Sequence, residues 1–202
     1  MTHVTSPDQA APPSNWNLPN ALTLLRILMV PLFAWLLLNH GGEETSWRVG
    51  AFVCFVAAMV TDRFDGEIAR RRGLVTNFGK IADPIADKAL TGTAFVGLSI
   101  LGELPWWVTL VVLGREVLIT VIRFVVIRYG VIAASRGGKL KTVLQTVGLC
   151  AFILPVADIF VLHALAIAVM AAAVAVTVWT GAEYVVEALR VWRAGRSGTA
   201  RT

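Results

Sequence analysis

Four regularly spaced aspartates are the residues of this chain whose type and spacing could support chemistry. Asp62 and Asp65 are three residues apart, and Asp83 and Asp87 are four residues apart. In a helix, either spacing places both side chains on one face. Carboxylate oxygens are the ligands that Mg²⁺, Mn²⁺ and Ca²⁺ prefer. Two neighbouring helices could therefore gather four carboxylates around divalent cations.

The number of carboxylates favours two metal ions over one, because Mg²⁺ usually takes one or two carboxylates plus phosphate oxygens and water. Two ions can hold the attacking and leaving oxygens of a displacement at phosphorus. Gly66, Ala69 and Gly79 leave space beside the aspartates, and Arg70 can donate two hydrogen bonds to a phosphate. The pattern predicts a site that holds a diphosphate for cleavage. The alternative is a set of paired charges that closes a helix bundle.

The composition places these carboxylates in a membrane protein. Of the 202 residues, 56% are hydrophobic and 15% are charged, which is typical of a polytopic membrane protein. A spanning helix needs about 20 mostly apolar residues. We therefore predict an all-α protein in which six transmembrane helices surround a polar cavity open to the cytoplasm. The segments that satisfy the length are 20–39, 47–70, 80–101, 105–129, 139–160 and 164–189.

The basic residues orient these predicted helices. A formal net charge of +5 suits nucleic acid or an anionic membrane surface, and the hydropathy favours the membrane, so we expect no nucleic acid. Most Lys and Arg residues collect on one side, which predicts a bacterial inner (plasma) membrane with both termini and the aspartates facing the cytoplasm. At 1.5 Å per residue, Asp62 would lie about 8 Å and Asp87 about 10 Å inside a ~30 Å core. The predicted divisions are a disordered tail (1–17), the membrane domain (18–191) and a basic tail (192–202).

A second group of ionisable residues interrupts the apolar segment 105–129. Arg115, Glu116 and Arg123 lie within it, with Arg115 about 15 Å past its start and near the middle of the membrane. Ionisable residues inside a membrane are functional candidates by default. These three residues form either an anion pocket of net positive charge or an Arg–Glu pair that fixes helix packing.

Two further polar groups lie at the cytoplasmic ends of predicted helices. Lys139 and Lys141 either bind a phosphate or simply mark the cytoplasmic side. Asn20, Thr23 and Arg26 repeat at three-residue spacing on one face of the first helix. They either line the cavity or form an ordinary helix start with an interfacial arginine.

The aspartate spacing resembles the signature of the CDP-alcohol phosphotransferase family, Asp-x2-Asp-Gly-x2-Ala-Arg-x8-Gly-x3-Asp-x3-Asp. All eight positions of that signature are present, at Asp62, Asp65, Gly66, Ala69, Arg70, Gly79, Asp83 and Asp87. Members transfer a group from a CDP-linked donor to an alcohol and release CMP. The resemblance implies that Asp62, Asp65 and Asp83 bind the metals, and that Asp87 acts as a general base and further ligand.

The same resemblance implies which residues contact the CDP part of the donor. These residues are Asp62, Asp65, Gly66, Ala69, Arg70, Gly79 and Asp83.

Shorter segments resemble the members of this family whose acceptor is sn-glycerol 3-phosphate. They are residues 17–26, 83–88, 114–123 and 138–142. The expected activity is transfer of a phosphatidyl group from CDP-diacylglycerol, with Mg²⁺ or Mn²⁺, in phospholipid biosynthesis. We expect the phosphate of the acceptor to be bound by Arg115, Arg123, Lys139 and Lys141.

Two alternatives remain. Within the family, the acceptor could be phosphatidylglycerol, which would make the chain a cardiolipin synthase. Outside it, a divalent-cation transporter could use the same aspartates, although a transporter binds its ion near mid-membrane with access to both faces. Gly92, Gly97 and Gly102 permit close helix packing, and we expect a homodimer.

Overall fold

The computed structural model shows an all-helical chain, with six α-helices, one short 3₁₀-helix and no strand among the described residues. It describes residues 18–72, 76–127, 136–155 and 159–199, but not the side chains of 18–19, 64–72, 77–78, 80–81, 136 and 194–199. The elements are α1 (Leu18–Leu38), η1 (Asn39–Gly42), α2 (Thr45–Arg72), α3 (Asn77–Ile100), α4 (Trp106–Val126), α5 (Arg136–Ile153) and α6 (Phe160–Thr199). The six predicted helices are all present.

The ends of the last two helices differ from the sequence prediction. Helix α5 ends at Ile153 rather than at residue 160, because Pro155 disfavours helical geometry in the residue before it. Helix α6 continues to Thr199, so residues 192–199 of the expected tail are its last turns. No proline follows Pro155 in the chain to stop α6 earlier.

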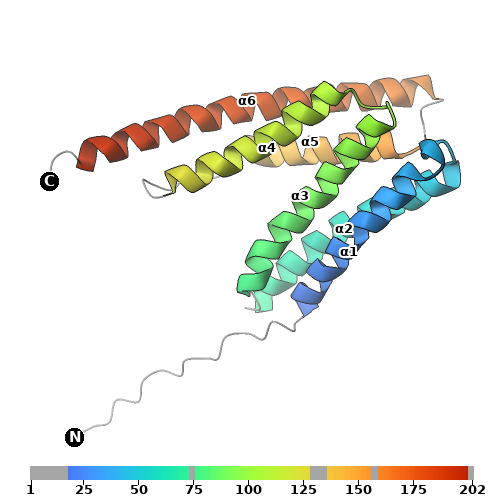
Figure 1. The fold of residues 1–202 in the computed structure, drawn as a ribbon, viewed down its shortest axis with the longest axis horizontal. Coiled ribbons are helices and arrows are strands. Elements are labelled where there is room, and N and C mark those ends of the chain that lie inside the picture. Colours follow the sequence, from blue (N-terminus) through green and yellow to red (C-terminus); the bar gives the residue numbers. More distant parts are fainter. Residues whose placement is uncertain (1–17, 73–75, 128–135, 156–158, 200–202) are drawn as a thin grey trace, which may run out of the picture.

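The helices form two groups that meet at one end of the molecule and diverge toward the other (Figure 1). Helix α1 packs against α2 and α3, whereas α6 packs against α4 and α5. A short link between α3 and α4 connects the groups at the joined end, where Gly102 has a φ of 76°. Glycine adopts this left-handed conformation readily because it lacks a Cβ. The ends that diverge carry the aspartates.

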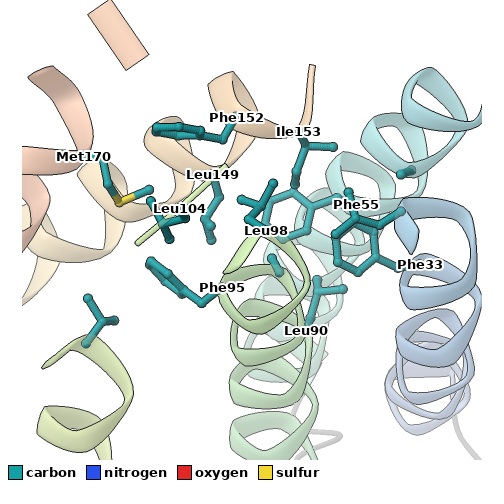
Figure 2. Packing of buried hydrophobic residues seen from close by; sticks show 14 of the residues in the cluster. Phe33, Phe55, Leu90, Phe95, Leu98, Leu104, Leu149, Phe152, Ile153 and Met170 are labelled. Carbon is teal, nitrogen blue, oxygen red and sulfur yellow. The ribbon is translucent and has the colours of Figure 1, made fainter. Parts of the chain in front are cut away.

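The apolar core lies where the two groups meet. Figure 2 shows Phe33 of α1 beside Phe55 of α2, with Leu98 of α3 and Ile153 of α5 close by. The rings of Phe33 and Phe55 are 5.4 Å apart between centroids. All four of these side chains are almost fully buried. The core therefore stabilises the joined end, away from the aspartates.

A buried arginine adds a polar connection to this joined end. Arg48 of α2 is only 3% exposed. Its Nε donates to the carbonyl of Ile153 at 3.0 Å, its Nη2 donates to the carbonyl of Phe152 at 2.5 Å, and the guanidinium forms an ion pair with Glu103. A cation at the last carbonyls of α5 satisfies groups that the helix itself leaves unpaired. Arg48 thus ties α2 to α5 and to the α3–α4 link.

The outer faces are apolar, as expected for contact with lipid. Phe160, Val161 and Leu110 are among the large apolar side chains that point outward. Two helices in the described part of the chain are long and apolar enough to cross a membrane, at Asn20–Gly42 and Phe160–Arg193. Helices α3, α4 and α5 are not among these two candidate spans, and each of them carries charged side chains within its length. The six-span topology and the cytoplasmic cavity stay predictions.

Candidate active site

The aspartate-bearing ends of α2 and α3 lie against the start of α1. Asp62 forms an ion pair with Arg26, and Asp83 Oδ1 accepts a hydrogen bond from Thr23 Oγ1 at 2.5 Å. Asp87 follows Asp83 by four residues in α3, which places both carboxylates on one face of that helix. Helix α1 therefore positions carboxylates from two different helices in one region.

The first turn of α3 packs closely against α1. Thr76 caps this helix: its Oγ1 accepts from the backbone N–H of Gly79 at 3.0 Å and donates to Asn20 Oδ1 at 2.9 Å. A Cβ on Gly79 would lie 3.0 Å from Asn20 Oδ1 and 3.8 Å from Asp83 Oδ2. Gly79 thus allows α3 to approach Asn20 of α1 closely, one turn before Asp83.

Two features of this region go beyond the sequence prediction. Arg26 is 0% exposed and pairs with Asp62, so its interpretation as an interfacial side chain is wrong. Thr76 was missed, although a threonine just before a helix is an ordinary N-cap signal. Asn20, Thr23 and Arg26 all contact the aspartate-bearing segments or the cap of α3.

The other signature residues of α2 cannot be placed as side chains. Asp65, Gly66, Ala69 and Arg70 lie in α2, but their side chains lie outside the described part of the structure. Among the side chains that are described, no three Asp, Glu, His or Cys residues come close enough together to hold a metal ion.

The donor chemistry nevertheless fits a hard cation. Asp62, Asp83 and Asp87 all offer carboxylate oxygens, which Mg²⁺ and Mn²⁺ prefer.

A charged cavity of about 440 Å³ lies between α3, α4 and α5. Asp87 and Lys88 line it from α3, Glu116 and Thr120 from α4, and Lys141 from α5. Its volume falls in the range of about 300–1,000 Å³ that is usual for small-molecule sites. Because Asp87 contributes to its wall, the cavity adjoins the aspartate group.

The charges of this cavity form one network. Lys141 Nζ donates to Glu116 Oε1, and Arg115 Nη1 donates to the same oxygen at 3.0 Å. Arg115 Nη2 also reaches Thr180 Oγ1 of α6 at 3.3 Å. Glu116 therefore joins α4 to α5 through Lys141, and its neighbour Arg115 joins α4 to α6.

The four basic residues predicted to bind a phosphate lie in different surroundings. Lys141 lines the cavity and is largely buried. Arg115 turns toward α6, whereas Arg123 and Lys139 are exposed, and none of these three lines the cavity. Lys88 was missed; its Nζ donates to Thr120 Oγ1 at 2.7 Å at the wall of the cavity. Its position directly after Asp87 was the available signal.

Sequence comparison places most of the chain in a known family. A family model described as CDP-alcohol phosphatidyltransferase matches residues 16–179. The chain belongs to this family. The match includes the whole aspartate signature and extends from the start of α1 well into α6.

Named relatives of this CDP-alcohol phosphatidyltransferase include bacterial proteins at substantial identity. It is 54% identical to a probable phosphatidylglycerophosphate synthase of Mycobacterium tuberculosis over 174 residues, covering 86% of this chain and 82% of that relative. It is 39% identical over 150 residues to the CDP-diacylglycerol–glycerol-3-phosphate 3-phosphatidyltransferase of Bacillus subtilis, covering 69% and 77%. It is 36% identical over 176 residues to the Escherichia coli protein of the same name, covering 84% and 93%. This family and the two long apolar helices indicate an integral membrane protein.

Proposed function

We propose that this chain transfers a phosphatidyl group from CDP-diacylglycerol to sn-glycerol 3-phosphate, giving phosphatidylglycerophosphate and CMP. The observation that carries the proposal is the position of Asp87, which shares one face of α3 with Asp83 and also lines the cavity with Lys88 and Lys141. One carboxylate can thus serve both a donor diphosphate and a phosphorylated acceptor. The names of the bacterial relatives support the same pair of substrates.

The donor would lie over the ends of α2 and α3. Asp62, Asp65, Asp83 and Asp87 would hold Mg²⁺ or Mn²⁺, two ions in our proposal, which when bound stabilise the negative charge of the diphosphate. Gly66, Ala69, Arg70 and Gly79 would contact the CDP part. Thr23 holds the Asp83 carboxylate in place, and Arg26 holds that of Asp62.

The acceptor would occupy the cavity between α3, α4 and α5. Lys141 and Lys88 offer ammonium groups to its phosphate, because both line the cavity. Asp87 would take the proton from the 1-hydroxyl of glycerol 3-phosphate as general base. That oxygen attacks the β-phosphorus of the donor, the bond to CMP breaks, and CMP leaves with both electrons of that bond.

The membrane setting completes the proposal. Six spans would place the divergent ends of the helices toward the cytoplasm in a bacterial inner membrane, as the basic residues predict. The acyl chains of the donor would stay among the apolar outer faces, and the chain would work as a homodimer. A divalent-cation transporter would bind its ion near mid-membrane with access to both faces, whereas the basic residues predict that these aspartates lie near the cytoplasmic face.

A cardiolipin synthase remains a second candidate because of one observation. An apolar groove of about 340 Å³ between α4 and α6 shares Val121 with the charged cavity. Such a groove could receive an acyl chain of phosphatidylglycerol while its glycerol headgroup reached Asp87.

Release of CMP from CDP-diacylglycerol distinguishes these functions. The purified protein is given Mg²⁺ or Mn²⁺ and one alcohol at a time: glycerol 3-phosphate, phosphatidylglycerol, inositol or serine. We expect glycerol 3-phosphate to give CMP release and a phosphatidylglycerophosphate product, and the other three alcohols to give neither. Release with phosphatidylglycerol instead would favour the cardiolipin reaction, and no release with any alcohol would refute the proposed function.

A further inference from the structure

Glu116 is the charged residue of the cavity to which the proposed reaction gives no task. Its Oε1 accepts hydrogen bonds from both Lys141 and Arg115, the second at 3.0 Å. Glu116 and Lys141 line the cavity together, and Lys141 is almost buried, with 8% of its side chain exposed. The carboxylate of Glu116 therefore lies where an anionic ligand of Lys141 would place its oxygen.

Binding of a phosphate at Lys141 has to change this contact. An ammonium group has three donors, but an anion that approaches it beside Glu116 is repelled by the carboxylate, more strongly in a poorly hydrated cavity than in water. The phosphate must therefore displace Glu116 from Lys141 or accept this repulsion. Either way, Glu116 lowers the affinity of the cavity for the phosphate.

The surroundings allow Glu116 to be displaced without being left unpaired. Arg115 holds the same carboxylate and is itself tied to Thr180 of α6. When Lys141 turns to a phosphate, Glu116 can keep the charge-assisted hydrogen bond to Arg115. The carboxylate then stays at the edge of the cavity and can take Lys141 back.

We propose that Glu116 is an internal competitor for the phosphate of the acceptor. It occupies Lys141 while the cavity is empty, yields to glycerol 3-phosphate, and recaptures Lys141 after the transfer. The product carries the same phosphate, so this recapture also favours release of the product into the membrane. The inference rests on the proposed function, and it assigns Glu116 a role in specificity rather than in the chemical step.

The test compares Glu116→Gln with the unchanged protein in the CMP-release assay. Gln keeps the size of the side chain and an oxygen for Arg115 but removes the charge that competes for Lys141. We expect the KM for glycerol 3-phosphate to fall by about tenfold, equivalent to about 1.4 kcal/mol. The inhibition constant of inorganic phosphate should fall with it, and kcat should also fall because the product leaves more slowly. The kcat/KM for CDP-diacylglycerol should not change, because this ratio does not depend on how fast the product leaves.

Glu183→Gln is the matched control. Glu183 is an exposed carboxylate on α6 that accepts a hydrogen bond from Trp179 Nε1 at 2.7 Å and does not line the cavity. The control removes the same charge, so its KM for glycerol 3-phosphate should stay unchanged. Lys141→Gln in the Glu116→Gln background should abolish the gain in affinity, because the competition acts through Lys141.

A second variant, Glu116→Asp, tests the same competition. If Glu116→Gln does not fold, Glu116→Asp keeps the charge but draws the carboxylate back toward α4, away from Lys141 of α5, and it should also lower the KM for glycerol 3-phosphate. A folded variant whose KM for glycerol 3-phosphate rises or stays the same would overturn the inference, since Glu116 would then only hold Lys141 in position. Absence of CMP release from the unchanged protein would refute the proposed function instead.

Discussion

The substitution Lys141→Gln tests whether the structure has identified the basic residue that binds the acceptor. Lys141 lines the cavity with Asp87, whereas Arg123 is exposed and does not line it. A hydrogen bond to a charged group contributes about 1.5–3 kcal/mol. Loss of the Lys141 ammonium should therefore raise the KM for glycerol 3-phosphate by about 10- to 100-fold, since 1.4 kcal/mol is about a factor of ten.

Arg123→Gln is the matched control. Arg123 lies on α4, which contributes to the wall of the cavity, but its own side chain does not line the cavity. Both substitutions remove one positive charge, but only Lys141 is close to the proposed acceptor. We expect Arg123→Gln to change the KM for glycerol 3-phosphate by less than about threefold, because an exposed charge is screened by water and salt. Steady-state CMP release at varied glycerol 3-phosphate and saturating donor measures both variants.

Two results of this assay would refute the assignment of Lys141 to acceptor binding. An equal rise in KM for the two variants would show that distance from the cavity does not decide the effect. A fall in kcat for Lys141→Gln with no change in KM would move Lys141 from acceptor binding to another step. Binding of CDP-diacylglycerol, measured separately, should stay unchanged in both variants.

The remaining predictions concern the aspartate group and the joined end of the helices. Asp87→Asn should abolish CMP release while the protein still binds CDP-diacylglycerol; normal turnover would remove Asp87 as the base. Gly79→Ala should lower kcat/KM by about tenfold or more, because the new Cβ lies 3.0 Å from Asn20 Oδ1 and small displacements of catalytic groups are costly; an unchanged kcat/KM would show that this space is not used. Chelation should stop CMP release, and either Mg²⁺ or Mn²⁺ should restore it; activity that persists in the chelator would argue against the metal proposal. Arg48→Ala should destabilise the fold by about 3–5 kcal/mol, because it leaves the carbonyls of α5 and the Glu103 carboxylate without their buried partner; thermal unfolding in detergent would measure this, and an unchanged midpoint would contradict it.

Much of the fold followed from local patterns in the chain. The helical character and the number of helices depend on runs of apolar residues, and hydrophobicity within one segment needs no knowledge of its neighbours. The spacing of Asp83 and Asp87 placed both on one face of α3 for the same reason, since 3.6 residues per turn is a property of the single helix. Helix ends were harder: α6 extends to Thr199 although Gly195 and Gly198 both disfavour a helix there.

The all-helical class, the apolar outer faces and the aspartate signature could be predicted from the amino-acid sequence, because apolar runs and residue spacing are local properties of each segment. Which helices pack together depends on contacts between distant segments, so it emerged only from the folded chain. It buried Arg26 against Asp62, placed Lys141 rather than Arg123 in the cavity, and used Arg48 to join α2 to α5. Basic residues of the same type look equivalent along the chain, but their partners come from other helices. Packing between helices therefore sets whether such a charge supports the fold, faces the outside or lines the cavity.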